Sequence, residues 1–143
     1  MRGTTSRIVI GLTVGLTVVA CDLSDAPLQE RTDAFAWSDH VPAGATVRVR
    51  NMNGEIEVVP SSDDTVRVTA SLKWRRGNPD EGLRMSGMRD GEGAMICAVW
   101  GKGECASDSY SSDFNFSGSG TDAAVHFRLE VPAGVRLDLQ GVN

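Results

Sequence analysis

Residues 41–53 read VPAGATVRVRNMN, and residues 131–143 read VPAGVRLDLQGVN. The two stretches align without a gap at an offset of 90 residues, and the VPAG start and the final Asn are identical. In each copy a Pro-Gly corner is followed by alternating apolar and polar residues, the pattern of a half-buried β-strand. The repeat therefore predicts two equivalent units, each a corner followed by a strand.

Alternation with a period of two also marks most of the remaining chain, and no helical stripe of useful length lies beyond the first twenty residues. The predicted strands cover 46–52, 55–58, 65–74, 94–100, 124–131 and 135–142, with a weak strand near 83–88. Asn53-Gly54, between the first two strands, is a strong turn signal. Residues 75–93 and the polar stretch 107–122 are expected to be loops. The sequence thus predicts an all-β fold.

The phase of the alternation predicts which side chains point inward, because a shift of one residue would turn every side chain to the other face. The inward positions are expected to be Val47, Val49, Ile56, Val58, Val66, Val68, Leu72, Val125, Phe127, Leu129, Leu137 and Leu139. The solvent-facing positions of the same strands are expected to be Arg48, Arg50, Glu55, Glu57, Arg67 and Arg128.

The N-terminal twenty residues have the organisation of a secretory signal peptide. Arg2 and Arg7 form a basic segment, and the uncharged run 8–20 is too short to span a bilayer comfortably. The run ends in Val-Val-Ala before Cys21, which resembles the lipobox of bacterial lipoproteins. That resemblance implies cleavage before Cys21 and acylation of its thiol. A simple signal peptide or an uncleaved anchor, with an incidental cysteine, is the alternative.

Composition and charge limit the function of the mature chain. The whole chain has 143 residues and a net charge of −5, and loss of Arg2 and Arg7 would leave a net charge of −7. A chain this acidic is a poor generic binder of nucleic acid and is repelled by anionic lipid headgroups. Residues 21–34 are polar and lack periodicity, so they are expected to be a tether ahead of a β domain over 35–143.

With Cys21 assigned to lipid, Cys97 and Cys105 remain as an even pair in an exported protein. Such a pair is expected to form a structural disulfide, which would contribute about 2–3 kcal/mol by the chain-entropy model. Free thiols are the alternative. A redox-active pair has closer spacing, and two cysteines alone cannot build a zinc site.

The units VPAGATVRVRNMNGEIEV and VPAGVRLDLQGVN resemble the DUF4097 family of adhesin-like repeat domains in bacterial envelope proteins. The resemblance covers about residues 35–143. It implies a right-handed β-solenoid in which short strands stack into parallel sheets, and no established catalytic residues. The second unit stops before a glycine equivalent to Gly54, which predicts that the solenoid is incomplete at its C-terminal end. A natural terminus on an edge strand is the alternative.

Two groups of residues are candidate binding sites. Lys73, Trp74, Arg75 and Arg76 combine three cations with an aromatic ring, and Tyr110, Phe114 and Phe116 are three aromatics in an otherwise polar loop. A core tryptophan flanked by solvated charges, and simple loop packing, are the competing interpretations. His40 and His126 lack metal-site spacing, and Glu55 and Glu57 fit a solvent face, so no catalytic site, metal or cofactor is expected.

These features predict a lipid-anchored protein of the bacterial cell envelope, facing the periplasm or the cell exterior. Its β-repeat domain would be non-catalytic and serve in binding or structure. The expected partners are the membrane, through Cys21, and an envelope glycan or protein, but no nucleic acid. The alternatives are an accessory protein of an envelope-stress sensor or a carbohydrate-active enzyme on a β-solenoid.

Overall fold

The computed structural model describes residues 26–113 and 122–141, which form ten strands and one short 3-10 helix, η1 (Pro79–Glu81). Sheet A has the strand order β1 (Gln29–His40), β4 (Thr65–Trp74), β9 (Ala124–Val131), β3 (Ile56–Pro60). Sheet B has the order β10 (Arg136–Gly141), β2 (Thr46–Asn51), β6 (Gly93–Trp100), β5 (Leu83–Asp90). A hairpin of β7 (Glu104–Ala106) and β8 (Ser109–Ser111) completes the all-β fold.

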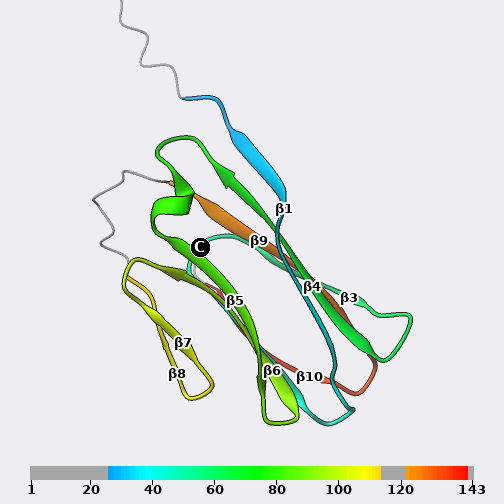
Figure 1. Ribbon diagram of the computed structural model, residues 1–143. Coiled ribbons are helices and arrows are strands. Elements are labelled where there is room, and N and C mark those ends of the chain that lie inside the picture. Colours follow the sequence, from blue (N-terminus) through cyan, green and yellow to red (C-terminus); the bar gives the residue numbers. More distant parts are fainter. Residues whose placement is uncertain (1–25, 114–121, 142–143) are drawn as a thin grey trace, which may run out of the picture.

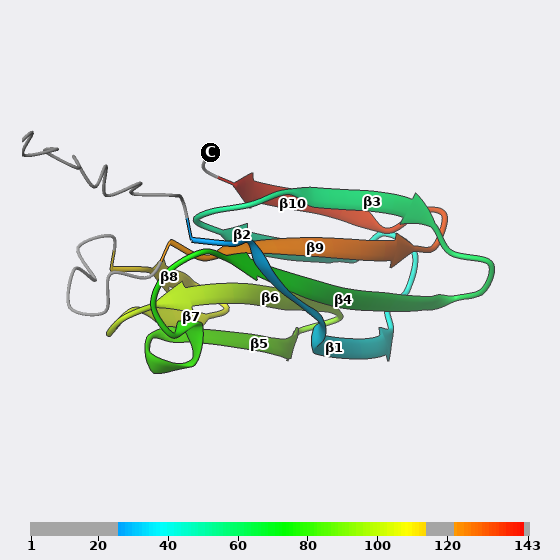
Figure 2. The ribbon, with the colours of Figure 1, turned by 90° about the horizontal axis from the view of Figure 1, so that it is seen from above.

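The two sheets pack face to face and enclose one main hydrophobic core (Figures 1 and 2). Sheet B contributes Val47, Val49 and Ile96, which are fully buried, and sheet A contributes residues such as Phe127 and Leu129. Burial of each such side chain stabilises the fold by roughly 1.5–3 kcal/mol. The alternating residues of the predicted strands are therefore the residues that hold the two layers together.

The two copies of the sequence repeat lie side by side. Strand β10 pairs with β2 in parallel, from Arg136 opposite Thr46 to Gly141 opposite Asn51, so the register equals the 90-residue offset of the repeat. The corners stack as well, because the Gly44 amide donates to the Gly134 carbonyl at 2.8 Å. Equivalent residues of the two units thus occupy equivalent positions in adjacent strands.

The corner after β2 carries the chain from sheet B to sheet A, so Asn53-Gly54 is a crossover and not the turn of a hairpin. The Asn51 and Asn53 side-chain amides donate to the carbonyls of Val125 and Ala123, at 2.8 and 2.9 Å. Gly54 has φ +118°, and a Cβ at this position would lie 2.1 Å from the Val125 oxygen. The asparagines and the glycine of the repeat therefore fasten this corner to the start of β9.

The predicted strand phase agrees with the pairing of all these strands, but the predicted burial is complete only in the central ones. The eight predicted inward residues of β2, β4 and β9 are buried. Ile56 is only half-buried, and Val58, Leu137 and Leu139 are 38–41% exposed, because β3 and β10 are edge strands.

Of the predicted solvent-facing residues, three are exposed as expected: Glu55, Glu57 and Arg128. Arg48, Arg50 and Arg67 are instead half-buried. Their guanidinium groups lie against the sheets in ion pairs, such as Arg50 with Asp138 at 2.7 Å.

Some predicted boundaries need correction. Strand β1 begins at Gln29, so residues 29–34 belong to sheet A and not to the tether predicted over 21–34. Strand β8 lies inside the predicted loop 107–122, and the weak strand near 83–88 is the full strand β5. The predicted signal peptide, over 1–20, lies outside the described residues.

The close approach at Gly54 can be tested by Gly54→Ala with Gly44→Ala as its control. Both glycines have positive φ, at +118° and +87°, but a Cβ at Gly44 meets no atom within 4 Å. Gly44→Ala should lower the free energy of unfolding by about 1–2 kcal/mol through backbone strain alone. Gly54→Ala should cost at least about 2 kcal/mol more in urea unfolding, because the crossover must also move away from β9. Equal losses would show that the contact with Val125 is unimportant.

Candidate binding site

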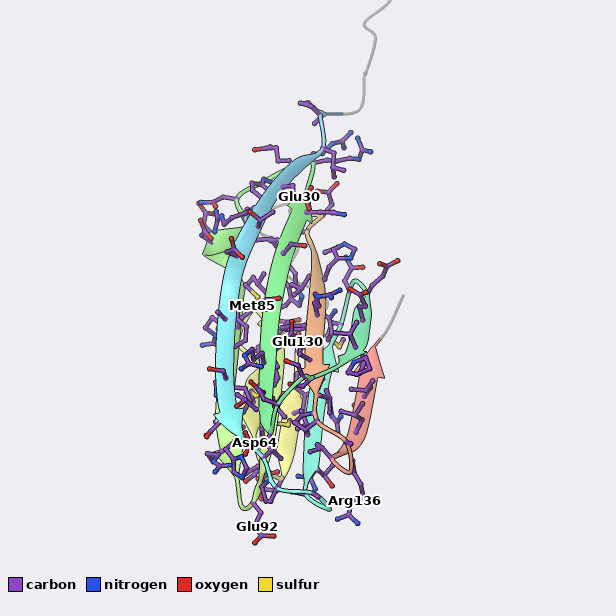
Figure 3. The ribbon with its side chains drawn as sticks, turned by 90° about the vertical axis from the view of Figure 1, so that its right-hand side faces the viewer. Glu30, Asp64, Met85, Glu92, Glu130 and Arg136 are labelled. Carbon is purple, nitrogen blue, oxygen red and sulfur yellow. A yellow bond between two sulfur atoms is a disulfide. The ribbon has the colours of Figure 1, made fainter. Side chains whose placement is uncertain are left out.

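The outer face of sheet A is polar, no other described element covers it, and it carries a hollow (Figure 3 looks onto this face). Cross-strand pairing aligns Glu57 of β3, Arg128 of β9 and Thr69 of β4 in one row. Ser71 of β4 lies opposite His126 of β9 in the next row. Because side chains alternate along each strand, these residues share the face opposite the core.

Strand β1 closes one side of this face through a β-bulge. Its pairing with β4 shifts register between Arg31 and Phe35, and Asp33 within the bulge has φ +54°. Asp33 is the only residue other than glycine with a positive φ among the described residues. Left-handed backbone in a non-glycine residue is uncommon, and bulges often re-aim side chains beside functional sites. The bulge brings Thr32 and Asp33 into the lining of the hollow.

The resulting pocket, which we call the sheet A site, has a volume of about 270 Å³. Its polar lining consists of Thr32, Asp33, Glu55, Glu57, Thr69, Ser71, His126 and Arg128. It combines three carboxylates and three hydroxyl groups with one guanidinium and one imidazole. The site is therefore rich in hydrogen-bond acceptors and carries a net negative charge.

Two contacts with carboxylates order the β3 and β9 side chains of the sheet A site. The Arg128 guanidinium contacts the Glu57 carboxylate at 2.7 Å, and the His126 Nδ1 atom lies 3.6 Å from the Glu55 carboxylate. The Glu55 side chain is still 82% exposed, so its oxygens are open to solvent. Its carboxylate can accept hydrogen bonds from hydroxyl or amino groups of a ligand.

The sequence missed this site because it was spread over four strands. Glu55 and Glu57 were expected to face solvent, and neither they nor His126 were given a binding role. The outward phase of β3, β4 and β9 could have revealed the two polar rows. No pattern in the sequence indicated the bulge at Asp33. This bulge is what brings residues of β1 into the lining of the sheet A site.

The outer face of sheet B, in contrast, is covered in part by the β7–β8 hairpin, which packs over β6. The predicted disulfide is confirmed: Cys97 of β6 is bonded to Cys105 of β7, with the two Cα atoms 6.1 Å apart. Tyr110 of β8 donates its hydroxyl to the Ala98 carbonyl at 2.9 Å and packs on a second small cluster of Met95, Cys97 and Val99. Burial raises the pKa of the Tyr110 hydroxyl.

Tyr110, predicted as a recognition residue, therefore makes internal contacts. Phe114 and Phe116, predicted with it, lie outside the described residues, as does Cys21.

Residues of the predicted basic patch over 73–76 also make contacts within the molecule. Trp74 is half-buried against the core, and the Arg31 guanidinium lies 5.6 Å from the centre of its ring. The Lys73 ammonium lies 3.9 Å from the Glu30 carboxylate. Arg75 and Arg76 have exposed side chains, while their backbone amides both donate to the Asp122 carboxylate. The structure thus gives Trp74 a packing role and leaves two guanidinium groups at the surface.

Comparisons of the chain with protein-family models, with curated proteins and with solved structures found no match. Within residues 26–113 and 122–141, no helix is both long and apolar enough to cross a membrane. The same residues contain no group of three or more His, Cys, Asp or Glu side chains placed to hold a metal ion.

The Asp122 contact predicts an acid-sensitive fold. The hydrogen bond from the Arg75 amide, and to a lesser extent the one from the Arg76 amide, holds the pKa of the Asp122 carboxyl below its ordinary value of 3.8. A lowered folded-state pKa contributes stability above the unfolded pKa, and this contribution disappears as the pH falls through the folded pKa. Asp122→Asn keeps an oxygen acceptor but does not titrate. The free energy of unfolding should therefore fall less steeply in Asp122→Asn than in the wild type between about pH 5 and about pH 2.

Urea unfolding across that pH range measures the slope. Asp108→Asn, which changes an exposed carboxylate in the β7–β8 turn, is the control and should follow the wild type. An Asp122→Asn profile parallel to the wild type would show that this carboxylate does not contribute to acid sensitivity.

Proposed function

We propose that this chain is a lipid-anchored, non-catalytic binding domain of the bacterial cell envelope, and that the sheet A site holds its ligand. The anchor part of the proposal rests on the lipobox-like sequence before Cys21 and on the disulfide between Cys97 and Cys105. Structural disulfides form and persist in oxidising compartments, as outside the cytoplasmic membrane.

The position of β1 supports a domain held close to the membrane. Since β1 begins at Gln29, few residues separate the domain from Cys21. A fully extended chain over that interval spans no more than about 30 Å. The acidic net charge keeps such a domain from lying on anionic headgroups, so the sheet A site remains open to ligands above the membrane.

The finer architecture we propose is that of a solenoid-type, adhesin-like repeat domain. Support comes from the in-register parallel pairing of β2 and β10, the parallel pairing of β3 and β9, and the corners that pass from one sheet to the other. In such a fold one unit cannot bury its apolar face alone, so units gain stability by stacking.

The proposed ligand is a glycan that carries hydroxyl and amino groups. Sugar hydroxyls donate to carboxylates and exchange hydrogen bonds with Ser and Thr, and amino groups match the excess of carboxylates in the sheet A site. The observation that carries this part is the bulge of β1, because left-handed Asp33 is maintained there at a cost in backbone energy.

The anchor is tested by Cys21→Ser. The substitution removes the thiol that would be acylated, so the protein should leave the membrane fraction or accumulate as an uncleaved precursor. Fractionation combined with metabolic labelling by a radioactive fatty acid measures both effects, with Cys105→Ser as a cysteine control that should keep its label. Fatty-acid label on Cys21→Ser equal to that on the wild type would refute the lipoprotein assignment.

The ligand is tested with chitosan oligosaccharides, which carry free amino groups, and with their N-acetylated forms. Wild-type protein should bind the amino form more tightly. Asp33→Asn keeps a side chain that tolerates left-handed backbone, and Glu55→Gln keeps the shape of the side chain. Each should weaken binding by about tenfold through loss of a charge-assisted hydrogen bond.

Glu92→Gln removes an exposed carboxylate from the β5–β6 turn, away from the sheet A site, and serves as the matched control (Figure 3). Its affinity should equal that of the wild type in isothermal titration calorimetry. Equal weakening in all three variants would indicate a general charge effect and not a site, and unchanged binding in Asp33→Asn and Glu55→Gln would place the ligand elsewhere.

A further inference from the structure

The disulfide between Cys97 and Cys105 is accessible from one side only. Cys97 is fully buried on β6, where the β7–β8 hairpin packs over it, whereas Cys105 on β7 is half-exposed. A pocket of about 300 Å³ lies beside the bond, and its lining includes Cys105 but not Cys97. A thiol from solvent can therefore reach the sulfur of Cys105 and not that of Cys97.

Charged and polar side chains line the same pocket. Arg84 and Ser86 are outward residues of β5, since their partners on β6 belong to the small cluster on the outer face of sheet B. The Arg84 guanidinium donates to the Gly103 carbonyl at 2.6 Å, which places it beside the start of β7, where Glu104 is exposed. The pocket thus combines a cation, a carboxylate and a hydroxyl group next to an accessible disulfide sulfur.

We propose that Cys105 is a site of thiol–disulfide exchange with a small thiol that carries both an ammonium group and a carboxylate, of which free cysteine is the simplest example. The Arg84 guanidinium matches the carboxylate of such a ligand, and the Glu104 carboxylate matches its ammonium group. The Ser86 hydroxyl offers a further hydrogen bond to either group. A volume of about 300 Å³ is at the lower end for ligand pockets, which suits a ligand of this size.

The exchange step is balanced without any further oxidant or reductant. The ligand thiolate attacks the Sγ atom of Cys105, forms a new sulfur–sulfur bond and breaks the bond to Cys97. The electron pair of the broken bond leaves on the Sγ atom of Cys97, which takes up a proton from water. The ligand sulfur is thereby oxidised, Cys97 is reduced, and Cys105 carries the ligand as a mixed disulfide.

The surroundings of Cys97 favour both its departure and its return. Arg50 pairs with Cys97 across β2 and β6, so the two side chains are on the same face of sheet B. A neighbouring cation stabilises a thiolate and makes it a better leaving group. The Tyr110 hydroxyl, bound to the Ala98 carbonyl at 2.9 Å, helps to hold the hairpin on β6 when the disulfide opens. The Cys97 thiol therefore stays near Cys105 and can attack the mixed disulfide to release the ligand.

The position of attack is tested by peptide mapping. Full-length protein in detergent, with any free thiol first blocked by N-ethylmaleimide, is mixed with free cysteine. The reaction is stopped at early times in urea that contains deuterium-labelled N-ethylmaleimide, which marks each newly formed thiol. Mass spectrometry should find the cysteine adduct on Cys105 and the deuterated label on Cys97. An adduct on Cys97, equal adducts on both residues, or no adduct would overturn the proposal.

Recognition of the ligand is tested by comparing four thiols at low salt. Free cysteine carries both charges, cysteamine lacks the carboxylate, mercaptopropionate lacks the ammonium group, and mercaptoethanol lacks both. Each rate of disulfide opening is divided by the rate of the same thiol with dithiodipyridine, a neutral reference disulfide, to remove differences in intrinsic reactivity. Free cysteine should then exceed mercaptoethanol by at least about threefold. Arg84→Gln should abolish its advantage over cysteamine, and Glu104→Gln its advantage over mercaptopropionate.

The controls repeat each chemical change at the other end of sheet B. Arg136→Gln and Glu92→Gln alter exposed side chains there and should keep the wild-type preference among the thiols (Figure 3). The mercaptoethanol rate within each variant corrects for altered access to the disulfide, such as that caused by loss of the hydrogen bond from Arg84 to Gly103. A wild-type preference retained by Arg84→Gln and Glu104→Gln, or lost equally in the controls, would show that the pocket does not select the thiol.

Discussion

The parallel pairing of β2 with its two neighbours is the interaction on which the rest of the structure depends. Strand β2 lies between β6 and β10, and its register with β10 equals the spacing of the sequence repeat. Its inward valines fill the core, its arginines bind Asp90 and Asp138 on the outer face, and Asn51 at its C-terminal end holds the crossover to sheet A. Displacing β2 would therefore disturb both sheets and the corner that joins them.

The alternation in the sequence predicted which side of a strand each side chain is on more reliably than it predicted which elements lie next to that strand. Val47 and Leu137 have the same alternating pattern, but periodicity reports only which way a side chain points, and only the structure shows that Val47 is buried while Leu137 is 38% exposed. Strand β1 was missed over its whole length, residues 29–40, because an edge strand with a bulge need not alternate. The sheet A site could not be assembled in advance, since its residues come from four strands and Asp33 enters through an irregularity.

The outer faces of the two sheets differ in how many of their side chains make internal contacts. On sheet B, the hairpin is attached to β6 by the disulfide at Cys97 and by the hydrogen bond of the Tyr110 hydroxyl. Arg48 forms an ion pair with Asp90 on the same face. On sheet A, Ser71, Thr69 and Glu55 remain open to solvent around a hollow. An open polar face on a paired sheet is a suitable binding surface, because its strands are already hydrogen-bonded and do not have to order when a ligand binds.

The bulge in β1 has a mechanical consequence. It divides the pairing of β1 with β4 into two blocks, Gln29 to Arg31 and Phe35 to His40. A force applied to the N-terminal end of β1 acts first on the short outer block, which Arg31 reinforces through Asp80 and the Trp74 ring. The bulge then acts as a break point between the blocks. Under such a force β1 would separate in two steps, and the first would free residues 29–34, with Asp33, while the pairing of Phe35 to His40 stays intact.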